Sequence, residues 1–137
     1  MNVLSATDAR NRFKEVLDAA TDGRSTIVRR DGRDDAAIVD LARLRYALEQ
    51  LLPPAEAVSE AGGWSLFIPG LPIAADAEAF DDAVEEMVEA LREYAEDWAT
   101  RLRHAPNHAN NWGVVQFVYL SDDDELRTWI AGAQTAR

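Results

Sequence analysis

The sequence contains no cysteine and has few basic side chains and no long hydrophobic run. The absence of cysteine excludes disulfide bonds, thiolate nucleophiles and cysteine-ligated zinc sites. The most apolar stretch, 112–120, is interrupted by Gly113 and Gln116 and falls well short of the ~20 residues that span a bilayer. The N-terminus lacks the basic start and apolar core of an export signal. We therefore expect a cytoplasmic protein that does not contact a membrane.

Charge is distributed unevenly along the 137 residues, which carry 25 acidic and 14 basic side chains and a formal net charge of -11. Nine basic and nine acidic residues precede Leu51, whereas five basic and sixteen acidic residues lie from Leu51 onward. Such asymmetry is typical of a nucleic-acid-facing segment beside an acidic segment that meets a basic partner. Because a diproline favours an extended linker, we expect a first domain over 1–52, a linker over 53–55, an acidic domain over 56–132 and a flexible tail over 133–137.

The first part of the chain has the pattern of a small mixed unit. A short apolar stretch precedes Ser5, which is placed to cap a helix that extends to Gly23. Two β-prone runs, 25–30 and 36–39, predict a hairpin with a long turn. Asp40 then caps a helix with an apolar stripe that ends at the diproline. A unit of this size buries little surface, so we expect it to dimerise through a shared core.

The second part has the apolar content of a folded domain. Its pattern predicts strands over 64–68 and 73–75, followed by a long amphipathic helix over 81–103. The continuous apolar run 114–120 predicts a buried strand, and Ser121 is placed to cap a final helix. The expected fold class is α+β, with the order β-β-α-β-α in this second domain.

The first part of the chain contains a serine followed by an acidic-Ala-Arg triplet, a hydrophobic helical segment, a strand with a basic residue before a polar-Gly turn, and a second strand that enters a helix. The residues of this pattern are Ser5, Asp8-Ala9-Arg10, Phe13, Leu17, Gly23, 27–32 and 36–41. In the order and spacing of these residues, the segment 1–52 resembles the Phd/YefM family of antitoxins. The turn at 33–35 departs from the usual short segment, so a hairpin tip of different shape is expected.

The second part of the chain has a Gly-aromatic strand start at 62–64, a Pro-x-Leu-Pro turn at 69–72, and two acidic residues and an alanine at the start of the predicted long helix, 81–83. In these segments, residues 60–98 resemble the HicB antitoxin domain. Ala77 and Ala79 replace that family's glycine and capping threonine. In HicB proteins the DNA-binding module usually follows this domain, and here the order is reversed. The resemblance implies that this domain binds a toxin.

Together the two resemblances imply an antitoxin of a type II toxin-antitoxin system, which neutralises a protein toxin and represses its own operon. The Phd/YefM resemblance implies a homodimer on a palindromic operator, with DNA contacts at Arg10 and at Arg29 or Arg30. Alternation along a strand lets only one of the latter two face DNA, and we favour Arg29. Asn11 and Lys14 are close enough to contribute, Lys14 from the same helix face as Arg10. Alternatively, these side chains only solvate the surface, since acidic residues are interleaved with them.

The predicted long helix has an acidic face that fits the implied toxin. An RNA-cleaving toxin must hold phosphates, so its active surface is basic and can be occluded by an acidic partner. The alternative is a solvated exterior. The candidate toxin-binding residues are Glu85, Glu86, Glu89 and Glu93. A tryptophan could also anchor a partner, but the sequence does not indicate which of Trp64, Trp98, Trp112 and Trp129 is exposed.

No pattern of an enzyme is present. Pro106 separates His104 from His108, and the Glu-x-x-His pair of carboxylate-bridged metal sites is missing. We therefore expect no catalytic residues, no metal and no cofactor. Two other hypotheses stay open: a stand-alone transcriptional regulator whose acidic domain senses another partner, and a metal-assisted nuclease, because the HicB domain is similar to part of the ribonuclease H fold.

Overall fold

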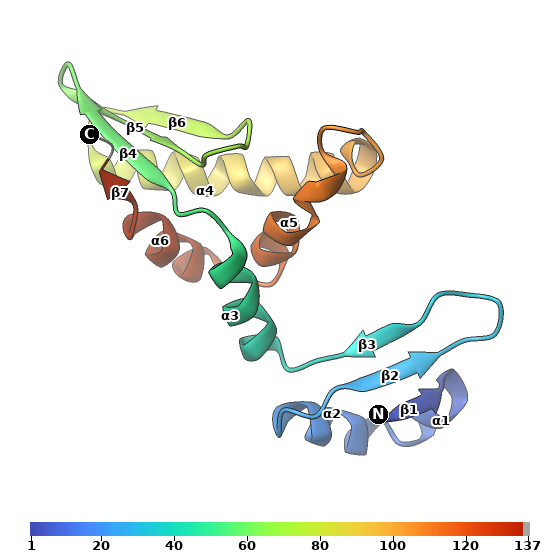
Figure 1. Ribbon diagram of the computed structural model, residues 1–137. Coiled ribbons are helices and arrows are strands. Elements are labelled where there is room, and N and C mark those ends of the chain that lie inside the picture. Colours follow the sequence, from blue (N-terminus) through green and yellow to red (C-terminus); the bar gives the residue numbers. More distant parts are fainter. Residues whose placement is uncertain (136–137) are drawn as a thin grey trace. The chain divides into compact units, whose positions relative to one another are not determined.

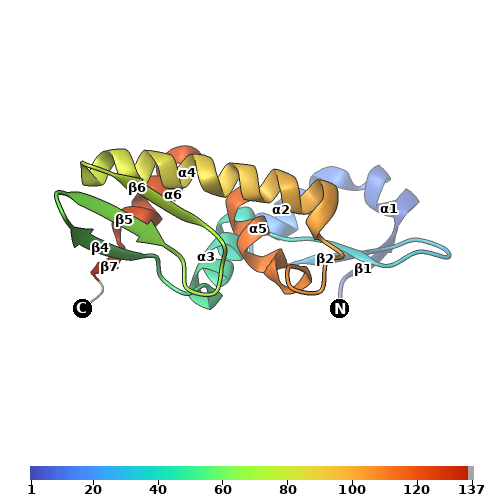
Figure 2. The ribbon, with the colours of Figure 1, turned by 90° about the horizontal axis from the view of Figure 1, so that it is seen from above.

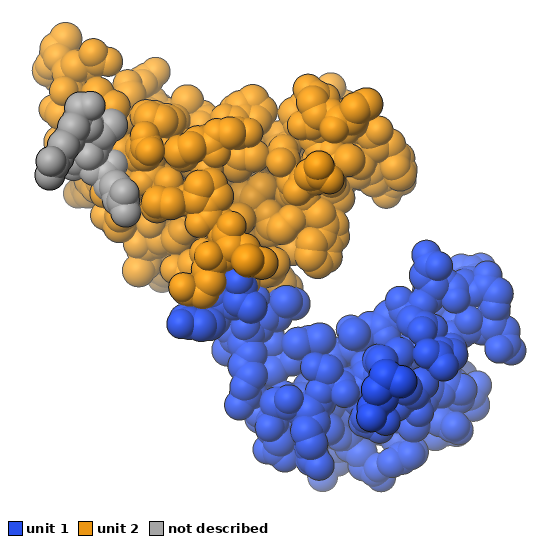
Figure 3. All heavy atoms as spheres, in the orientation of Figure 1, with its two compact units in different colours: residues 1–47 blue, residues 48–137 orange. Residues whose placement is uncertain are grey.

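The computed structural model describes residues 1–135 and shows a mixed α+β fold. The chain divides into two compact units, unit 1 over residues 1–47 and unit 2 over residues 48–137 (Figure 3). The boundary lies inside a helix, α3 (Leu41–Leu51), which the diproline follows. Within the described part of the chain, no helix is both long enough and apolar enough to cross a bilayer.

Unit 1 is a three-stranded sheet with two helices against one face (Figure 1). The strands lie in the order β1-β2-β3, with β1 parallel and β3 antiparallel to β2. The elements are β1 (Val3–Ser5), α1 (Ala6–Asn11), α2 (Phe13–Thr21), β2 (Thr26–Arg29) and β3 (Ala36–Ile38). The predicted hairpin is thus confirmed as β2 and β3.

Helix capping in unit 1 follows the local sequence. The Ser5 hydroxyl accepts the Asp8 backbone N–H at 3.0 Å, and the Asp40 carboxylate accepts the Arg43 backbone N–H at 3.0 Å. Both side chains are therefore N-caps, as predicted. The prediction of one helix from Ser5 to Gly23 was wrong, because the backbone leaves the helical region at Arg12 (φ -117°, ψ 31°).

The break at Arg12 separates Arg10 in α1 from Lys14 in α2, so these two side chains do not share one continuous helix face. Each short helix buries its own small apolar side chains against the sheet, Ala9 from α1 and Val16 and Ala20 from α2. A spacing of three and four residues tolerates a one-residue kink. The periodicity therefore predicted helical structure here without revealing the break.

Unit 2 has a four-stranded sheet in the order β6-β5-β4-β7. Strand β4 pairs antiparallel with β5 and parallel with β7, and β5 pairs antiparallel with β6. The strands are β4 (Glu56–Glu60), β5 (Gly63–Phe67), β6 (Ala74–Ala77) and β7 (Gln134–Thr135). The predicted strands over 64–68 and 73–75 correspond to β5 and β6. Strand β4 was not predicted, although it pairs with β5 along its whole length.

The helices of unit 2 lie beside this sheet, with the long helix α4 running along β5 and β6 (Figures 1 and 2). Helix α4 continues into a π-helical turn, and two shorter helices pack against it. The helices are α4 (Phe80–Asp97), the π turn Trp98–Leu102, the 3-10 turn Ala109–Asn111, α5 (Trp112–Tyr119) and α6 (Asp123–Ala131). The core between the layers contains Leu66, Ile68, Met87, Leu91, Phe117, Leu126 and Ile130, all buried.

The prediction of a strand over 114–120 was wrong, because this segment lies in helix α5 and the turn after it. Val114, Val115, Phe117 and Val118 are buried, whereas Tyr119 is exposed. A short apolar run is compatible with a buried strand or a buried helix, and periodicity alone does not distinguish them. The predicted order β-β-α-β-α is therefore also wrong: three strands precede the helices, and the last strand follows them.

The final helix begins one residue later than predicted. Its N-cap is Asp122 and not Ser121. The Asp122 carboxylate accepts the Glu125 backbone N–H at 2.7 Å, and the Glu125 carboxylate accepts the Asp122 backbone N–H at 3.0 Å. Ser121 is buried, and its hydroxyl donates to the Phe117 carbonyl at 2.6 Å. Of the tail predicted over 133–137, residues 134–135 form β7, and residues 136–137 lie outside the described residues.

Arg92 of α4 connects the end of α5 to the start of α6. Its guanidinium donates to the carbonyls of Val118 and Ser121 at 2.6 and 2.8 Å, and to the Asp123 carboxylate at 2.8 Å. The hydrogen bond from Arg92 lowers the pKa of Asp123 from its ordinary value of 3.8. One side chain thereby contacts two backbone carbonyls near the junction of α5 and α6, where helix ends leave carbonyls available; the Val118 carbonyl also accepts the Ser121 backbone N–H at 3.3 Å.

Candidate functional site

The five predicted DNA-binding side chains all lie in unit 1 and are all exposed. Arg10 and Asn11 end α1, Lys14 lies in the first turn of α2, and Arg29 is the last residue of β2. Arg30 follows in the turn between β2 and β3. The strand alternation used to choose between the two hairpin arginines therefore reaches only as far as Arg29.

An apolar groove lies next to Arg10. It has a volume of about 450 Å³ and is formed where α1 and the start of α2 meet β2 and β3. Arg10 is the charged side chain of its lining; the apolar lining comes from Ala6, Ala9, Phe13, Val28 and Ile38. Phe13 is 52% exposed although it borders this groove. The groove is thus an open apolar surface with one arginine at its edge.

Unit 1 has a very small core. Among its described residues the buried apolar side chains are those of Ala9, Val16 and Ala20, and the buried polar one is Thr26. Larger apolar side chains of the unit are instead exposed: Phe13, Leu17, Val39, Leu41 and Tyr46. Three small or medium side chains contribute little burial free energy. This unit therefore leaves most of its large apolar surface uncovered within one copy of the chain.

The turn end of the hairpin, where β2 leaves the ladder with β3, holds an exposed ion pair. The Arg29 Nε atom lies 3.3 and 3.2 Å from the two carboxylate oxygens of Asp35, and the Nη2 atom lies 3.1 Å from Oδ2. Arg30 donates to the backbone carbonyl of Asp34 at 3.4 Å. Because Val28 lines the groove on the helix-covered side, alternation places Arg29 on the opposite side of β2.

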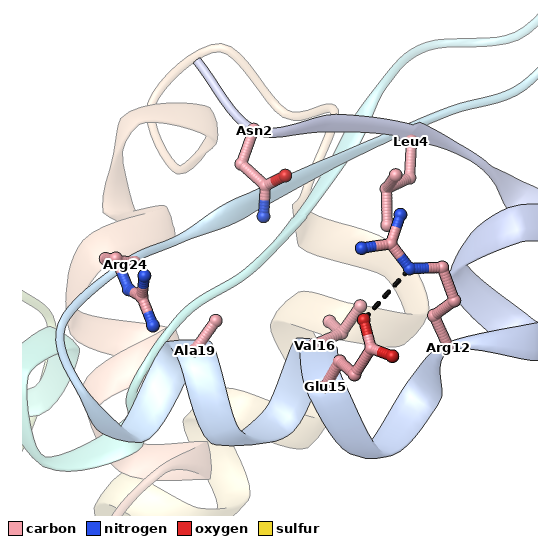
Figure 4. A pocket seen from close by; sticks show the side chains of 7 residues that line it. All are labelled: Asn2, Leu4, Arg12, Glu15, Val16, Ala19 and Arg24. Carbon is pink, nitrogen blue, oxygen red and sulfur yellow. Dashed lines mark hydrogen bonds and ion pairs between the residues drawn. The ribbon is translucent and has the colours of Figure 1, made fainter.

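A second, polar hollow of about 360 Å³ lies between β1 and α2 (Figure 4). Arg12 and Arg24 stand at its two ends (Figure 4). Each has a carboxylate partner nearby, Glu15 at 3.0 Å and Asp22 at 3.5 Å respectively. Sequence reasoning did not find this hollow, because the segments that line it are brought together only by the parallel pairing of β1 with β2.

The predicted acidic face of α4 is present, and its buried face is apolar as expected. Exposed carboxylates recur every three or four residues along it. We call this set the acidic stripe: Asp82, Glu86, Glu89, Glu93 and Glu96. Within the described residues no ion pair joins a member of the acidic stripe to a basic side chain. The acidic stripe therefore presents uncompensated negative charge to solvent.

Glu85 differs from the other three predicted toxin-binding glutamates. It faces α6, where Arg127 donates to its two carboxylate oxygens at 2.5 and 3.4 Å. The hydrogen bond that Arg127 donates to Glu85 raises the pKa of Arg127. Glu85 is thus already paired within unit 2, while Glu86, Glu89 and Glu93 belong to the acidic stripe.

The structure shows which tryptophan is exposed. Trp112, at the start of α5, is 52% exposed. The other three are partly covered: Trp64 packs edge-on against Phe80, Trp129 packs edge-on against Phe117, and Trp98 donates its indole N–H to the His108 carbonyl at 2.9 Å. Trp112 is therefore the tryptophan best placed to meet another molecule.

The two histidines do not form a metal site in the described residues, where no three His, Asp or Glu side chains are grouped as ligands. The Nδ1 atom of His108 lies 2.9 Å from the Tyr94 hydroxyl, which also accepts a hydrogen bond from the Asn111 side chain at 2.7 Å. These contacts attach the segment after the π turn to α4. His108 therefore has a structural partner in this fold.

Comparisons with known proteins identify the family of this chain. Residues 1–131, which include both units, match a family model described as "PHD_like: Antitoxin of toxin-antitoxin, RelE / RelB, TA system". No curated protein matches the chain. The crystal structure of an antitoxin part of a proposed toxin/antitoxin system from Syntrophomonas wolfei subsp. wolfei is similar, with 26% sequence identity and a TM-score of 0.77 over 99% of this chain and 100% of that chain. This chain therefore belongs to the PHD-like family of antitoxins of toxin-antitoxin systems.

Proposed function

We propose that unit 1 forms a homodimer that binds operator DNA, and that the acidic stripe of unit 2 binds and neutralises a basic, RNA-cleaving toxin. The observation that carries this proposal is the contrast between the two units. Unit 1 exposes an apolar groove beside Arg10, whereas unit 2 has a complete core and exposes uncompensated carboxylates. An antitoxin needs one surface for its toxin and, if it represses its operon, another for DNA.

The dimer is supported by the small core of unit 1. Covering the groove with a second copy would bury Phe13 and other exposed apolar side chains, which is the usual source of stability for a unit too small to fold alone. A two-fold arrangement would also present two copies of Arg10 and Arg29, matching a palindromic operator. Whether two dimers cooperate on the operator depends on the spacing of its half-sites.

The toxin contact is supported by the electrostatics of α4. An exposed row of carboxylates attracts a basic surface over several ångströms and accelerates association. A toxin that cleaves RNA must neutralise phosphates, so its substrate-binding surface has the opposite charge to the acidic stripe. Occupation of that surface by the acidic stripe would exclude RNA directly. In this role the chain is a regulatory protein with no chemistry of its own.

The proposal is tested by expressing the product of the neighbouring open reading frame with and without this protein. We expect growth arrest that co-expression relieves, together with a stable complex of the two purified proteins. An arrest that this protein does not relieve would contradict the proposed neutralisation. If the neighbouring product causes no arrest and does not bind, the stand-alone regulator becomes the better explanation.

Reversing charges on the acidic stripe should slow toxin association. We expect the variant Glu86→Lys/Glu89→Lys to reduce the association rate constant at least about tenfold at low salt, because steering by opposite charge is lost. Stopped-flow or surface-based kinetics measures this rate. The matched control is Glu60→Lys/Glu78→Lys, which has the same net charge change at exposed positions of unit 2 outside α4. Equal rates for the two variants would mean that only net charge matters.

Arg10→Ala should weaken operator binding without affecting toxin binding. An arginine that contacts a guanine edge contributes about 1–3 kcal/mol, so we expect roughly a 5- to 150-fold loss of affinity in a fluorescence anisotropy titration at fixed salt. Because Arg10 borders the groove, sedimentation must show that the variant keeps the oligomeric state of the wild type. Arg24→Ala, an exposed arginine elsewhere in unit 1, is the control. Unchanged affinity for Arg10→Ala would remove Arg10 from the DNA contacts.

A further inference from the structure

The Arg29 and Asp35 pair suggests how the hairpin would read DNA, if unit 1 binds an operator as proposed above. We infer that Asp35 is a positioning residue that holds the Arg29 guanidinium so that its free end faces a guanine base rather than a phosphate. The ligand of this site is thus the major-groove edge of a G·C pair. The inference adds two points to the proposed function. Asp35 acts without touching DNA, and the base that Arg29 contacts is guanine.

The geometry leaves the correct edge of the guanidinium available. Asp35 accepts from Nε and from Nη2, which is one side of the planar group. Arginine has five N–H donors, so both hydrogens of Nη1 and the second hydrogen of Nη2 point away from Asp35. Those donors form the end of the fork, which matches the O6 and N7 acceptors of guanine with two parallel hydrogen bonds.

The backbone around this pair is constrained. Val28 pairs with Ala36 at the end of the β2-β3 ladder, so Arg29 and Asp35 are the next positions opposite each other. On its other side Arg29 pairs with Ser5 of β1, which caps α1. Strand pairing on one side and the carboxylate on the other therefore set the direction of the Arg29 side chain.

The charges around Arg29 favour a base over the DNA backbone. Asp35 neutralises the positive charge of Arg29 and would repel a phosphate brought to the same place, whereas the guanine edge is polar but uncharged. The pair is also exposed, with side-chain exposures of 58% for Arg29 and 41% for Asp35. Exposed ion pairs add little to stability. The role we assign to the pair is accordingly in recognition and not in folding.

The test compares specific and non-specific binding by the full-length protein. The probes are a labelled duplex of the DNA immediately upstream of this protein's coding sequence and a shuffled duplex of the same composition. We expect Asp35→Asn to bind the shuffled duplex more tightly, since a negative charge is lost, while the preference for the upstream duplex falls about fivefold or more. The melting temperature should be unchanged.

Two controls separate positioning from charge. Asp34→Asn removes the same charge one residue away, where the side chain does not bond Arg29, and should leave the preference intact. In an Arg29→Lys background, which keeps the charge but lacks the fork, Asp35→Asn should cause no further loss of preference. If Asp35→Asn and the wild type prefer the upstream duplex over the shuffled duplex equally, the role of Asp35 is overturned, while operator binding stands. A wild-type protein that does not prefer the upstream duplex would overturn operator binding itself.

Discussion

Phe13→Asp is expected to convert the proposed dimer into a monomer. Phe13 is half-exposed at the edge of the unit 1 groove, so its removal from water requires a second molecule. Burying one phenylalanine contributes about 1.5–3 kcal/mol, and a two-fold interface buries two. Because about half of each Phe13 is already covered, roughly half of that sum is lost, and at 1.4 kcal/mol per factor of ten the dissociation constant should rise at least about tenfold. Sedimentation equilibrium at micromolar concentration measures the change.

The control for this experiment is Tyr46→Asp. Tyr46 is a similarly exposed aromatic side chain of unit 1, at 65% exposure, and lies outside the lining of the groove. We expect this variant to remain a dimer. Circular dichroism distinguishes dissociation from unfolding, since each outcome changes the helical signal differently. A monomeric wild type, or a Phe13→Asp dimer as stable as the wild type, would show that the groove is not the dimer interface.

Arg92→Ala is expected to destabilise unit 2 strongly. The substitution removes the guanidinium donor from the part-buried carbonyls of Val118 and Ser121, although the Val118 carbonyl keeps the Ser121 N–H at 3.3 Å. Loss of a charged hydrogen-bond donor from such backbone groups, together with the Asp123 pairing, costs about 1–3 kcal/mol. For a unit of fewer than 100 residues, about 2 kcal/mol lowers the melting temperature by roughly 8–16 °C. Differential scanning calorimetry measures this shift, and growth rescue should weaken in parallel.

Arg101→Ala is the matched control for Arg92. Arg101 makes an exposed pair with Asp97 at 3.3 Å and should change stability by less than about 0.5 kcal/mol. The lowered pKa of Asp123 means that its pairing with Arg92 stabilises the folded state above the ordinary pKa of 3.8 and is lost as the pH falls through the lower folded value.

Arg92→Ala should remove this acid-dependent part of the stability, so that its deficit relative to wild type narrows at low pH. Melting temperatures of the two proteins across the acid range measure the difference. A deficit that is the same at neutral pH and at the lowest pH would mean that the carbonyl contacts of Arg92, not its pairing with Asp123, account for the whole effect.

Much of the local structure follows directly from the residues. The hydroxyl of Ser5 and the carboxylate of Asp40 cap their helices because such caps act over three residues. The alternation of apolar and acidic side chains specifies which face of α4 is buried, since each face repeats every three or four residues. The charge asymmetry likewise depends on composition alone. These features need no partner distant in the sequence.

Other features depended on contacts between distant segments. The run 114–120 became helix α5 because it packs on α4, and 134–135 became a strand because β4 offered a free edge. Tertiary structure also paired Glu85 with Arg127 while it left Glu86 and Glu89 in the acidic stripe. Sequence alone determined the capping, amphipathicity and charge of each segment, because these are local properties. Packing decided its partners and which charges stay uncompensated, because burial and pairing depend on residues far apart in the chain.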